Sequence, residues 1–74
     1  MKAVNSISLT YFGVSIVVPE EANWVATDKD GMVCWFKCKP YPIGNWWDTK
    51  FEYEKICTVD LEGIYWKDTL VQVE

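Results

Sequence analysis

Apolar and polar side chains alternate along much of the chain, which is the period-two pattern of half-buried β-strands. In the first such stretch, serine and threonine separate Ile, Leu and Tyr side chains. A turn signal at Phe12 and Gly13 follows, and then an apolar run that ends at Pro19, which removes a backbone donor. We therefore predict a first hairpin over residues 1–19.

The strongest hairpin signal lies in residues 24–40. An Asp-Gly pair at residues 30–31 is flanked by arms rich in Trp, Val, Thr, Phe and Cys, which suit a pleated, half-buried surface. Glycine enters the left-handed region without a Cβ clash, so this pair favours a tight turn. On the second arm, the face with Cys34, Phe36 and Cys38 is expected to be the more buried one. We expect the rest of the chain to pack around this hairpin.

The second half of the chain alternates less regularly. Residues 39–48 are predicted to form a loop, because two prolines and a glycine lie close together there. Residues 49–59 are predicted to form a strand, with a phase slip near Lys55 that favours a β-bulge. In the tail we expect a short helical turn over residues 66–69 and an edge strand over residues 71–74.

These elements predict an all-β fold, or a β-rich one with a single short helical turn. The expected architecture is a small antiparallel meander of about five strands, curled or barrel-like, with residues 1–74 forming one domain. The chain has five Trp, four Tyr and three Phe residues, enough for a dense core and for a surplus on the surface. Because so short a chain buries only about 60% of its unfolded surface, we expect a homodimer or a higher homo-oligomer.

The charge balance argues against several classes of function. Seven lysines and no arginine stand against eleven acidic residues, for a net charge of −4. A generic nucleic-acid binder needs a basic face, so direct nucleic-acid binding is not expected. No apolar run approaches the ~18–20 residues of a membrane span, and the first residues lack the apolar segment of a signal peptide. We therefore expect a cytoplasmic protein without membrane association.

The chemistry-bearing residues do not form a catalytic or metal-binding pattern. In an extended strand, Cys34 and Cys38 would lie roughly 13 Å apart, too far for one zinc ion or a disulfide. Cys57 is the third cysteine and there is no histidine, so we expect free thiols and no metal, although a cross-strand pair of Cys57 with Cys34 or Cys38 stays geometrically open. No nucleophile motif or cofactor fingerprint occurs, so we expect neither an enzyme nor a cofactor.

The aromatic stretch at residues 39–48 is the candidate functional site. Trp46, Trp47 and Asp48 follow closely after Lys39 and Tyr41. Trp and Tyr dominate the hot spots of protein interfaces, so these rings are candidate anchors for a partner. A second interpretation is that they stack on a nucleotide base, with Lys37 or Lys39 on its phosphate. A third is that one or both tryptophans cap the open end of the core.

Two motifs carry a family resemblance. Residues 24–31 have the form W-x-A-x-D-x-D-G, and residues 66–70 have the form W-x-x-T-L. These motifs resemble a group of short accessory proteins encoded by tailed bacteriophages, whose closing motif has Ser where this chain has Thr69. The resemblance covers most of the chain. It implies an accessory protein that acts in the cytoplasm of an infected bacterium and is not part of the virion.

Phage accessory proteins of this size usually act by binding. The resemblance therefore implies a non-enzymatic protein that binds and inhibits or redirects a bacterial host protein, such as a defence protein. The alternative is a sponge that sequesters a small signalling nucleotide at an oligomer interface.

Overall fold

The structure, a computed structural model, describes residues 5–73 of the 74-residue chain. Within that range it is all-β, with one short helical turn as predicted. Residues 1–4 of the predicted first hairpin and residue 74 of the predicted last strand lie outside the described residues. The elements are β1 (Ser6–Tyr11), β2 (Val14–Pro19), β3 (Trp24–Thr27), β4 (Met32–Phe36), β5 (Tyr41–Ile43), β6 (Trp46–Asp48), β7 (Tyr53–Thr58), the 3-10 helix η1 (Trp66–Asp68) and β8 (Val71–Gln72).

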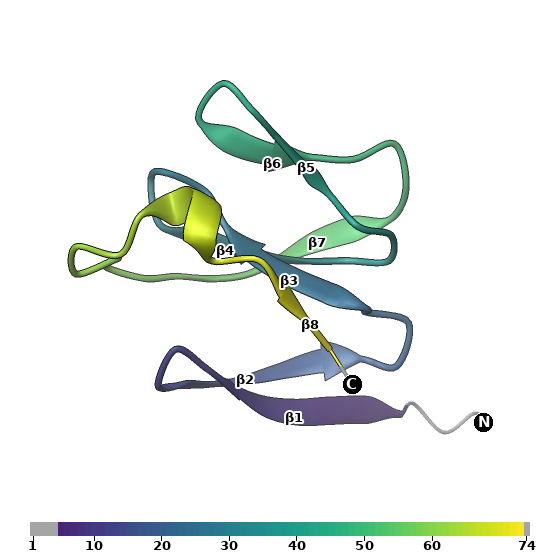
Figure 1. The fold of residues 1–74 in the computed structure, drawn as a ribbon. Coiled ribbons are helices and arrows are strands. Elements are labelled where there is room, and N and C mark those ends of the chain that lie inside the picture. The colour runs from purple at the N-terminus through teal and green to yellow at the C-terminus, as the bar shows by residue number, and fades with distance from the viewer. Residues whose placement is uncertain (1–4, 74) are drawn as a thin grey trace.

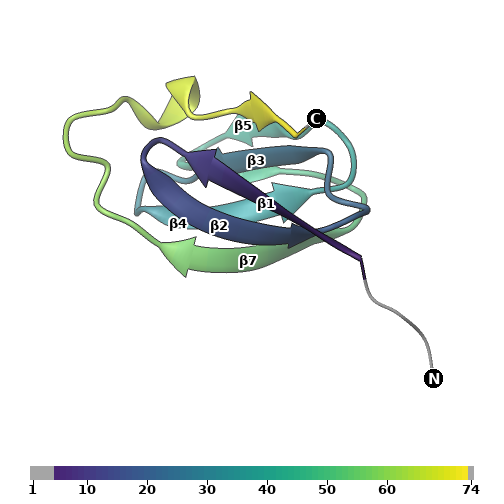
Figure 2. The same cartoon turned by 90° about the horizontal axis from the view of Figure 1, so that it is seen from below.

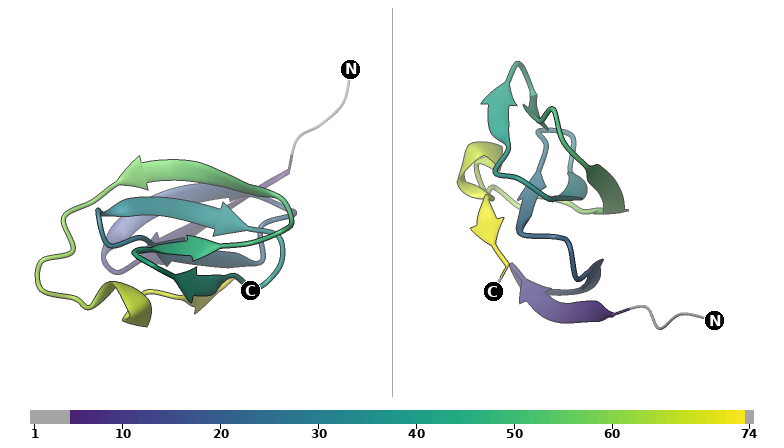
Figure 3. Two further views of the ribbon diagram at one scale, coloured as in Figure 1. Left: turned by 90° about the horizontal axis from the view of Figure 1, so that it is seen from above. Right: turned by 90° about the vertical axis from the view of Figure 1, so that its right-hand side faces the viewer.

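The strands form three layers (Figure 1). A four-stranded sheet in the order β7-β4-β3-β8 lies in the middle, with the β1–β2 hairpin on one side and the β5–β6 hairpin on the other. Seen from below, β1 and β2 cross over the central strands (Figure 2), and a side view separates the two hairpins (Figure 3). The predicted small antiparallel all-β fold is confirmed. Residues 5–73 hold eight strands in three sheets, where a single meander of about five strands was expected. In residues 5–73 the three sheets stay separate and do not close into a barrel.

The β3–β4 hairpin at the centre is buried on both faces. Val25 and Trp35 are paired and pack toward the β1–β2 hairpin, whereas Ala26 and Cys34 are paired and pack toward β5–β6 and η1. Within β4, the predicted face of Cys34, Phe36 and Cys38 is no more buried than the other face, because each face has its own cover. Beyond β4 the prediction holds, since Cys38 is half-buried and Lys37 and Lys39 are exposed. A strand covered on both faces reads as a continuous apolar run, as β4 does.

The turn of the central hairpin depends on Gly31, whose φ is +91°. Its carbonyl accepts the Val59 N–H at 2.8 Å, and a Cβ at this position would collide with the Val59 carbonyl oxygen. Asp30 completes the turn by accepting the Met32 N–H at 3.0 Å. The Asp-Gly signal thus marks a left-handed residue and a close backbone approach at the same point.

The aromatic stretch forms a hairpin rather than the predicted loop. β5 and β6 pair in the register Tyr41↔Asp48, Pro42↔Trp47 and Ile43↔Trp46. Gly44 has a φ of +57°, which suits the first central residue of a type II′ turn. Pro42 is in the second pair from a two-residue turn, where an antiparallel hairpin makes no backbone hydrogen bond. Its missing N–H therefore leaves no partner unsatisfied, and the proline is compatible with a strand.

The last third of the chain follows the prediction more closely. The register between β4 and β7 shifts between Val33 and Cys34, which pair with Cys57 and Lys55, so Ile56 is the extra residue of a bulge. The helical turn is present as η1, and β8 pairs with β3 at the edge of the central sheet. The predicted bulge near Lys55, the helical turn and the edge strand are confirmed.

Candidate functional site

The β5–β6 hairpin divides the predicted site residues between its two faces. Paired residues share a face, and successive residues alternate between faces. Tyr41, Trp46 and Asp48 therefore share the outer face with Ile43, whereas Trp47 is on the inner face, toward the central sheet. We call Tyr41, Ile43 and Trp46 the aromatic face.

Trp47 belongs to the core. Its side chain is only 8% exposed, and its ring packs edge-to-face on Trp66, with the ring centroids 5.9 Å apart. The indole Nε1–H donates to the Thr27 carbonyl at 3.0 Å, so its one polar group is satisfied. Of the two tryptophans considered as anchors, Trp47 thus fits the interpretation of a core cap.

Backbone contacts hold the hairpin against the turn of β3–β4. The Trp47 N–H donates to the Asp28 carboxylate at 2.7 Å, and the Lys29 N–H donates to the Asn45 carbonyl at 3.0 Å. Burial raises the pKa of Asp28, the hydrogen bond from Trp47 opposes that rise, and the nearby charge of Asp30 adds to it. The aromatic face is therefore presented in one fixed orientation.

The aromatic face is open to solvent. Trp46 is 50% exposed, and Tyr41 and Ile43 are exposed to a similar degree. Tyr53 in β7 is exposed as well, with its ring stacked on Phe36 at 5.9 Å. No sequence signal distinguishes Tyr53 as a surface residue, because alternation does not say which face of a strand lacks a cover.

A small pocket of about 180 Å³ lies beside Trp46, and its charge is negative. Asp28 and Asp48 both line it. Lys39, the predicted phosphate ligand, instead has its ammonium over the Trp24 ring, 5.4 Å from the centroid. The structure therefore groups Tyr41, Trp46 and Asp48 and directs the Lys39 ammonium toward another ring.

The three cysteines are free thiols in residues 5–73. Cys34 packs with the core on the β5–β6 side, whereas Cys57 packs with the core on the β1–β2 side, so the sheet separates them. Burial raises the pKa of Cys34 to about 11, which keeps the thiol protonated and unreactive. Cys38 lies beyond the end of β4.

Within residues 5–73, no group of three or more His, Cys, Asp or Glu side chains is placed to hold a metal ion. In the same range, no helix has the length and apolar character that a membrane crossing requires.

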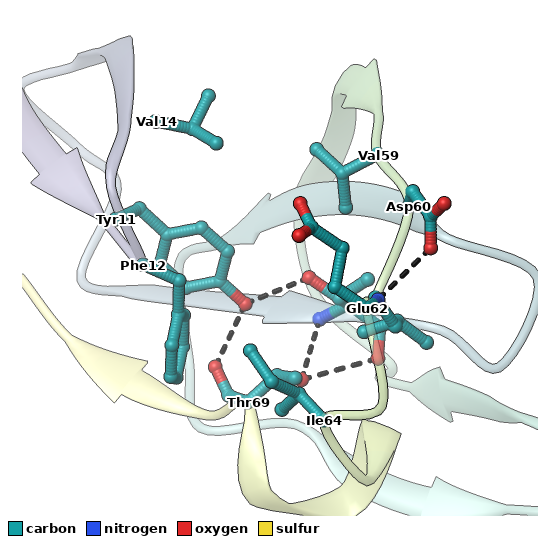
Figure 4. A pocket seen from close by; sticks show the side chains of 10 residues that line it. Tyr11, Phe12, Val14, Val59, Asp60, Glu62, Ile64 and Thr69 are labelled. Atoms are coloured by element: carbon teal, nitrogen blue, oxygen red, sulfur yellow. Dashed lines mark hydrogen bonds between the residues drawn. The ribbon is translucent and has the colours of Figure 1, made fainter.

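A second, larger pocket of about 330 Å³ lies beside Tyr11, between the turn after β1 and the segment after β7 (Figure 4). The Tyr11 hydroxyl donates to the Thr69 carbonyl at 2.8 Å and also contacts the Thr27 hydroxyl at 2.8 Å. The Thr27 N–H in turn donates to the Thr69 hydroxyl at 2.9 Å. This buried network ties β1, β3 and the residue after η1 together and forms the floor of the pocket.

No local pattern in the sequence predicts this pocket. Its rim combines the turn after β1 with the segment after β7, which are far apart in the chain.

No family model, no curated protein and no solved structure matches this chain.

Proposed function

We propose that this chain is a non-enzymatic binding protein that contacts another protein through the aromatic face. The observation that carries the proposal is the contrast between two adjacent residues: Trp47 anchors the hairpin in the core, and Trp46 is left half exposed. Exposed large apolar side chains that the core does not use are typical of interaction sites. Tryptophan and tyrosine are also the side chains that contribute most at hot spots.

The rigidity of the hairpin supports the same proposal. Binding is weakened when loops and side chains must be ordered on association. Here Asp28 and the Thr27 carbonyl already hold Trp47 by two hydrogen bonds, so the aromatic face needs little ordering. The face is therefore suited to binding with a small entropic cost.

The charges near Trp46 indicate what its partner presents. Asp28, Lys29 and Asp30 lie with Trp46 around a shallow depression, and Asp48 is on the same face of the hairpin, so the carboxylates outnumber the one ammonium group. A complementary partner has an apolar recess for the indole and basic side chains around it. With the resemblance to phage accessory proteins, we propose a bacterial host protein in the cytoplasm, which this chain inhibits or redirects.

Nucleotide sequestration is the alternative, with Trp46 or Tyr41 stacked on a base. The pocket beside Trp46 is lined by two carboxylates, which repel phosphate. The Lys37 ammonium lies 3.6 Å from the Glu52 carboxylate, and the Lys39 ammonium lies over Trp24. Protein binding fits these charges better than nucleotide binding does.

The test compares capture of host proteins by three forms of the chain. The tagged wild type, Trp46→Ala and Val17→Ala are each incubated with bacterial lysate. Val17 is a matched control because it is also exposed but lies on the β1–β2 hairpin. We expect a specific host protein with the wild type and with Val17→Ala, and its loss with Trp46→Ala.

Equal capture by all three forms would contradict the use of the aromatic face. A thermal-shift panel of nucleotides separates the alternative, because a ligand that binds only the folded state raises the apparent stability. A large shift that Trp46→Ala removes would favour the sponge.

A further inference from the structure

The pocket beside Tyr11 is independent of the aromatic face and has its own chemistry. Its lining is part apolar and part polar, and the apolar part has Phe12 and Val14 on one side and Val59 and Ile64 on the other. At about 330 Å³ it reaches the lower end of the ~300–1,000 Å³ range of small-molecule sites. The pocket is therefore large enough for a small ligand with an apolar body.

The polar side chains on the floor of the pocket already have hydrogen-bond partners within the protein. The Tyr11 hydroxyl contacts the Thr27 hydroxyl and donates to the Thr69 carbonyl, and the Thr69 hydroxyl accepts the Thr27 N–H and donates to a backbone carbonyl. In residues 5–73, no buried side-chain nitrogen or oxygen lacks a hydrogen-bond partner. Recognition must therefore come from apolar contact and from the charges at the rim.

The charges at the rim are all negative. Asp60 and Glu62 are the charged residues that line the pocket. Figure 4 shows the Glu62 carboxylate reaching over the pocket between Tyr11 and Val59, while Asp60 turns back and accepts the Glu62 N–H at 2.9 Å. Within residues 5–73, no lysine ammonium lies within ion-pair distance of Glu62. A ligand cation would therefore meet a carboxylate that has no internal counter-ion there.

Two aromatic side chains, Tyr11 and Phe12, line the same pocket as these carboxylates. Phe12 is 50% exposed, and its ring packs edge-to-face on Tyr11 with the centroids 4.9 Å apart. The faces of such rings attract cations, most strongly where an ammonium or guanidinium group is also partly shielded from water. Rings and carboxylates together favour a positively charged group.

Both turns at the rim carry residues that raise the energy of the backbone. Phe12 has a φ of +47° and Glu62 a φ of +50°, and in residues 5–73 they are the non-glycine residues with positive φ. Asn or Gly would adopt this conformation at lower cost. Stability alone would therefore not place Phe and Glu here, whereas a ligand site that needs a ring and a carboxylate would.

We propose that this pocket binds a small organic cation: an amine or guanidinium group attached to an apolar body. The body packs against Phe12, Val14 and Ile64, and the cationic group lies beside Glu62. The proposal is independent of the protein-binding function assigned to the aromatic face.

The test titrates three probes of similar shape into the full chain: 2-phenylethylamine, 2-phenylethanol and 3-phenylpropanoate. NMR shifts of the Val14 and Ile64 methyl groups and the Glu62 amide report binding at this pocket. We expect the amine to bind about tenfold more tightly than the alcohol, from one ion pair and one cation–π contact, and the carboxylate to bind weakest. The preference for the amine should shrink as salt is added.

Three variants give the test its controls. Glu62→Gln keeps the shape and removes the charge, so amine and alcohol should then bind about equally. Asp60→Asn keeps an acceptor for the Glu62 N–H and should reduce amine binding less. Phe12→Asn should raise the melting temperature, because Asn suits the turn, and should weaken the binding of amine and alcohol alike.

The proposal is overturned by any of several results. It fails if none of the probes binds at millimolar concentration, or if the alcohol binds as tightly as the amine. It also fails if the shifts lie outside the pocket, or if Glu62→Gln keeps the full preference for the amine. A fold check by the backbone amide spectrum of each variant keeps these results separate from unfolding.

Discussion

The two hairpins that cover the central sheet differ in what they leave outside. On β1–β2, the inner positions include Ile16 and Val18, which are buried, and the outer positions of β1 are Ser6, Ser8 and Thr10. On β5–β6, the inner position Trp47 is buried, and the outer positions carry the aromatic face. The first hairpin exposes Val17 at an outer position and Phe12 in its turn, whereas the second presents Tyr41, Ile43 and Trp46 together on one face. This difference supports the proposal that β5–β6 contacts a partner as well as covering the core.

The largest effect that tests this comparison is expected from Trp47→Ala. Removing a buried tryptophan typically lowers the free energy of unfolding by about 3–5 kcal/mol, which is a large share of the stability of a small domain. The indole's bond to Thr27 and its contact with Trp66 are lost with it. Urea denaturation followed by far-UV circular dichroism measures the change. A stability close to the wild type would mean that the hairpin does not depend on Trp47.

Tyr11→Phe makes the corresponding test on the β1–β2 side. The substitution removes the hydroxyl that bonds Thr69 and Thr27 and leaves a buried carbonyl without its donor. A loss of about 1–3 kcal/mol is expected in the same denaturation experiment. Tyr41→Phe is the matched control, because Tyr41 is exposed and should change stability by less than about 0.5 kcal/mol. Equal effects of the two substitutions would remove the distinction between an inner and an outer tyrosine.

The contact between Asp28 and Trp47 predicts a smaller, pH-dependent effect. Because the pKa of folded Asp28 is raised, the folded state favours the protonated carboxyl. The contribution of this group to stability is present at low pH and is lost as the pH rises through and above its ordinary value of 3.8. Asp28→Asn keeps an acceptor for the Trp47 N–H and removes this titration.

The measurement is the difference in unfolding free energy between Asp28→Asn and the wild type across the acidic range. We expect the variant to gain relative to the wild type as the pH rises, by a small amount because solvent screens a half-exposed group. A difference that moves the other way would show that the hydrogen bond from Trp47 outweighs the cost of burial.

The smallest change in stability is expected from Trp46→Ala, within about 0.5 kcal/mol, because the side chain is half exposed. Its effect should appear in association instead. Native mass spectrometry of the wild type reports the oligomeric state and any retained ligand together. A homo-oligomer that Trp46→Ala converts to monomers would assign self-association to the aromatic face, and an oligomer unchanged in the variant would place that interface elsewhere.

The predicted turns, the bulge and the helical turn, which rest on short stretches of sequence, agree with the structure. The turns at residues 12–13 and 30–31, the bulge near Lys55 and the helical turn at η1 each follow from local turn chemistry or from a break in alternation. Such signals act over a few residues, because backbone sterics and side-chain period are local properties.

Other features depend on which layer packs against which. Two adjacent tryptophans have the same local signal, and only the contact of one hairpin face with the central sheet makes Trp47 a core residue and Trp46 a surface residue. Pro42 suggested a loop, but its place in the register of β5 and β6 made a strand possible. Phe12 and Glu62 meet at one pocket although they are far apart in the chain. Burial and juxtaposition of this kind arise from long-range packing, whereas the all-β class arises from the alternation itself.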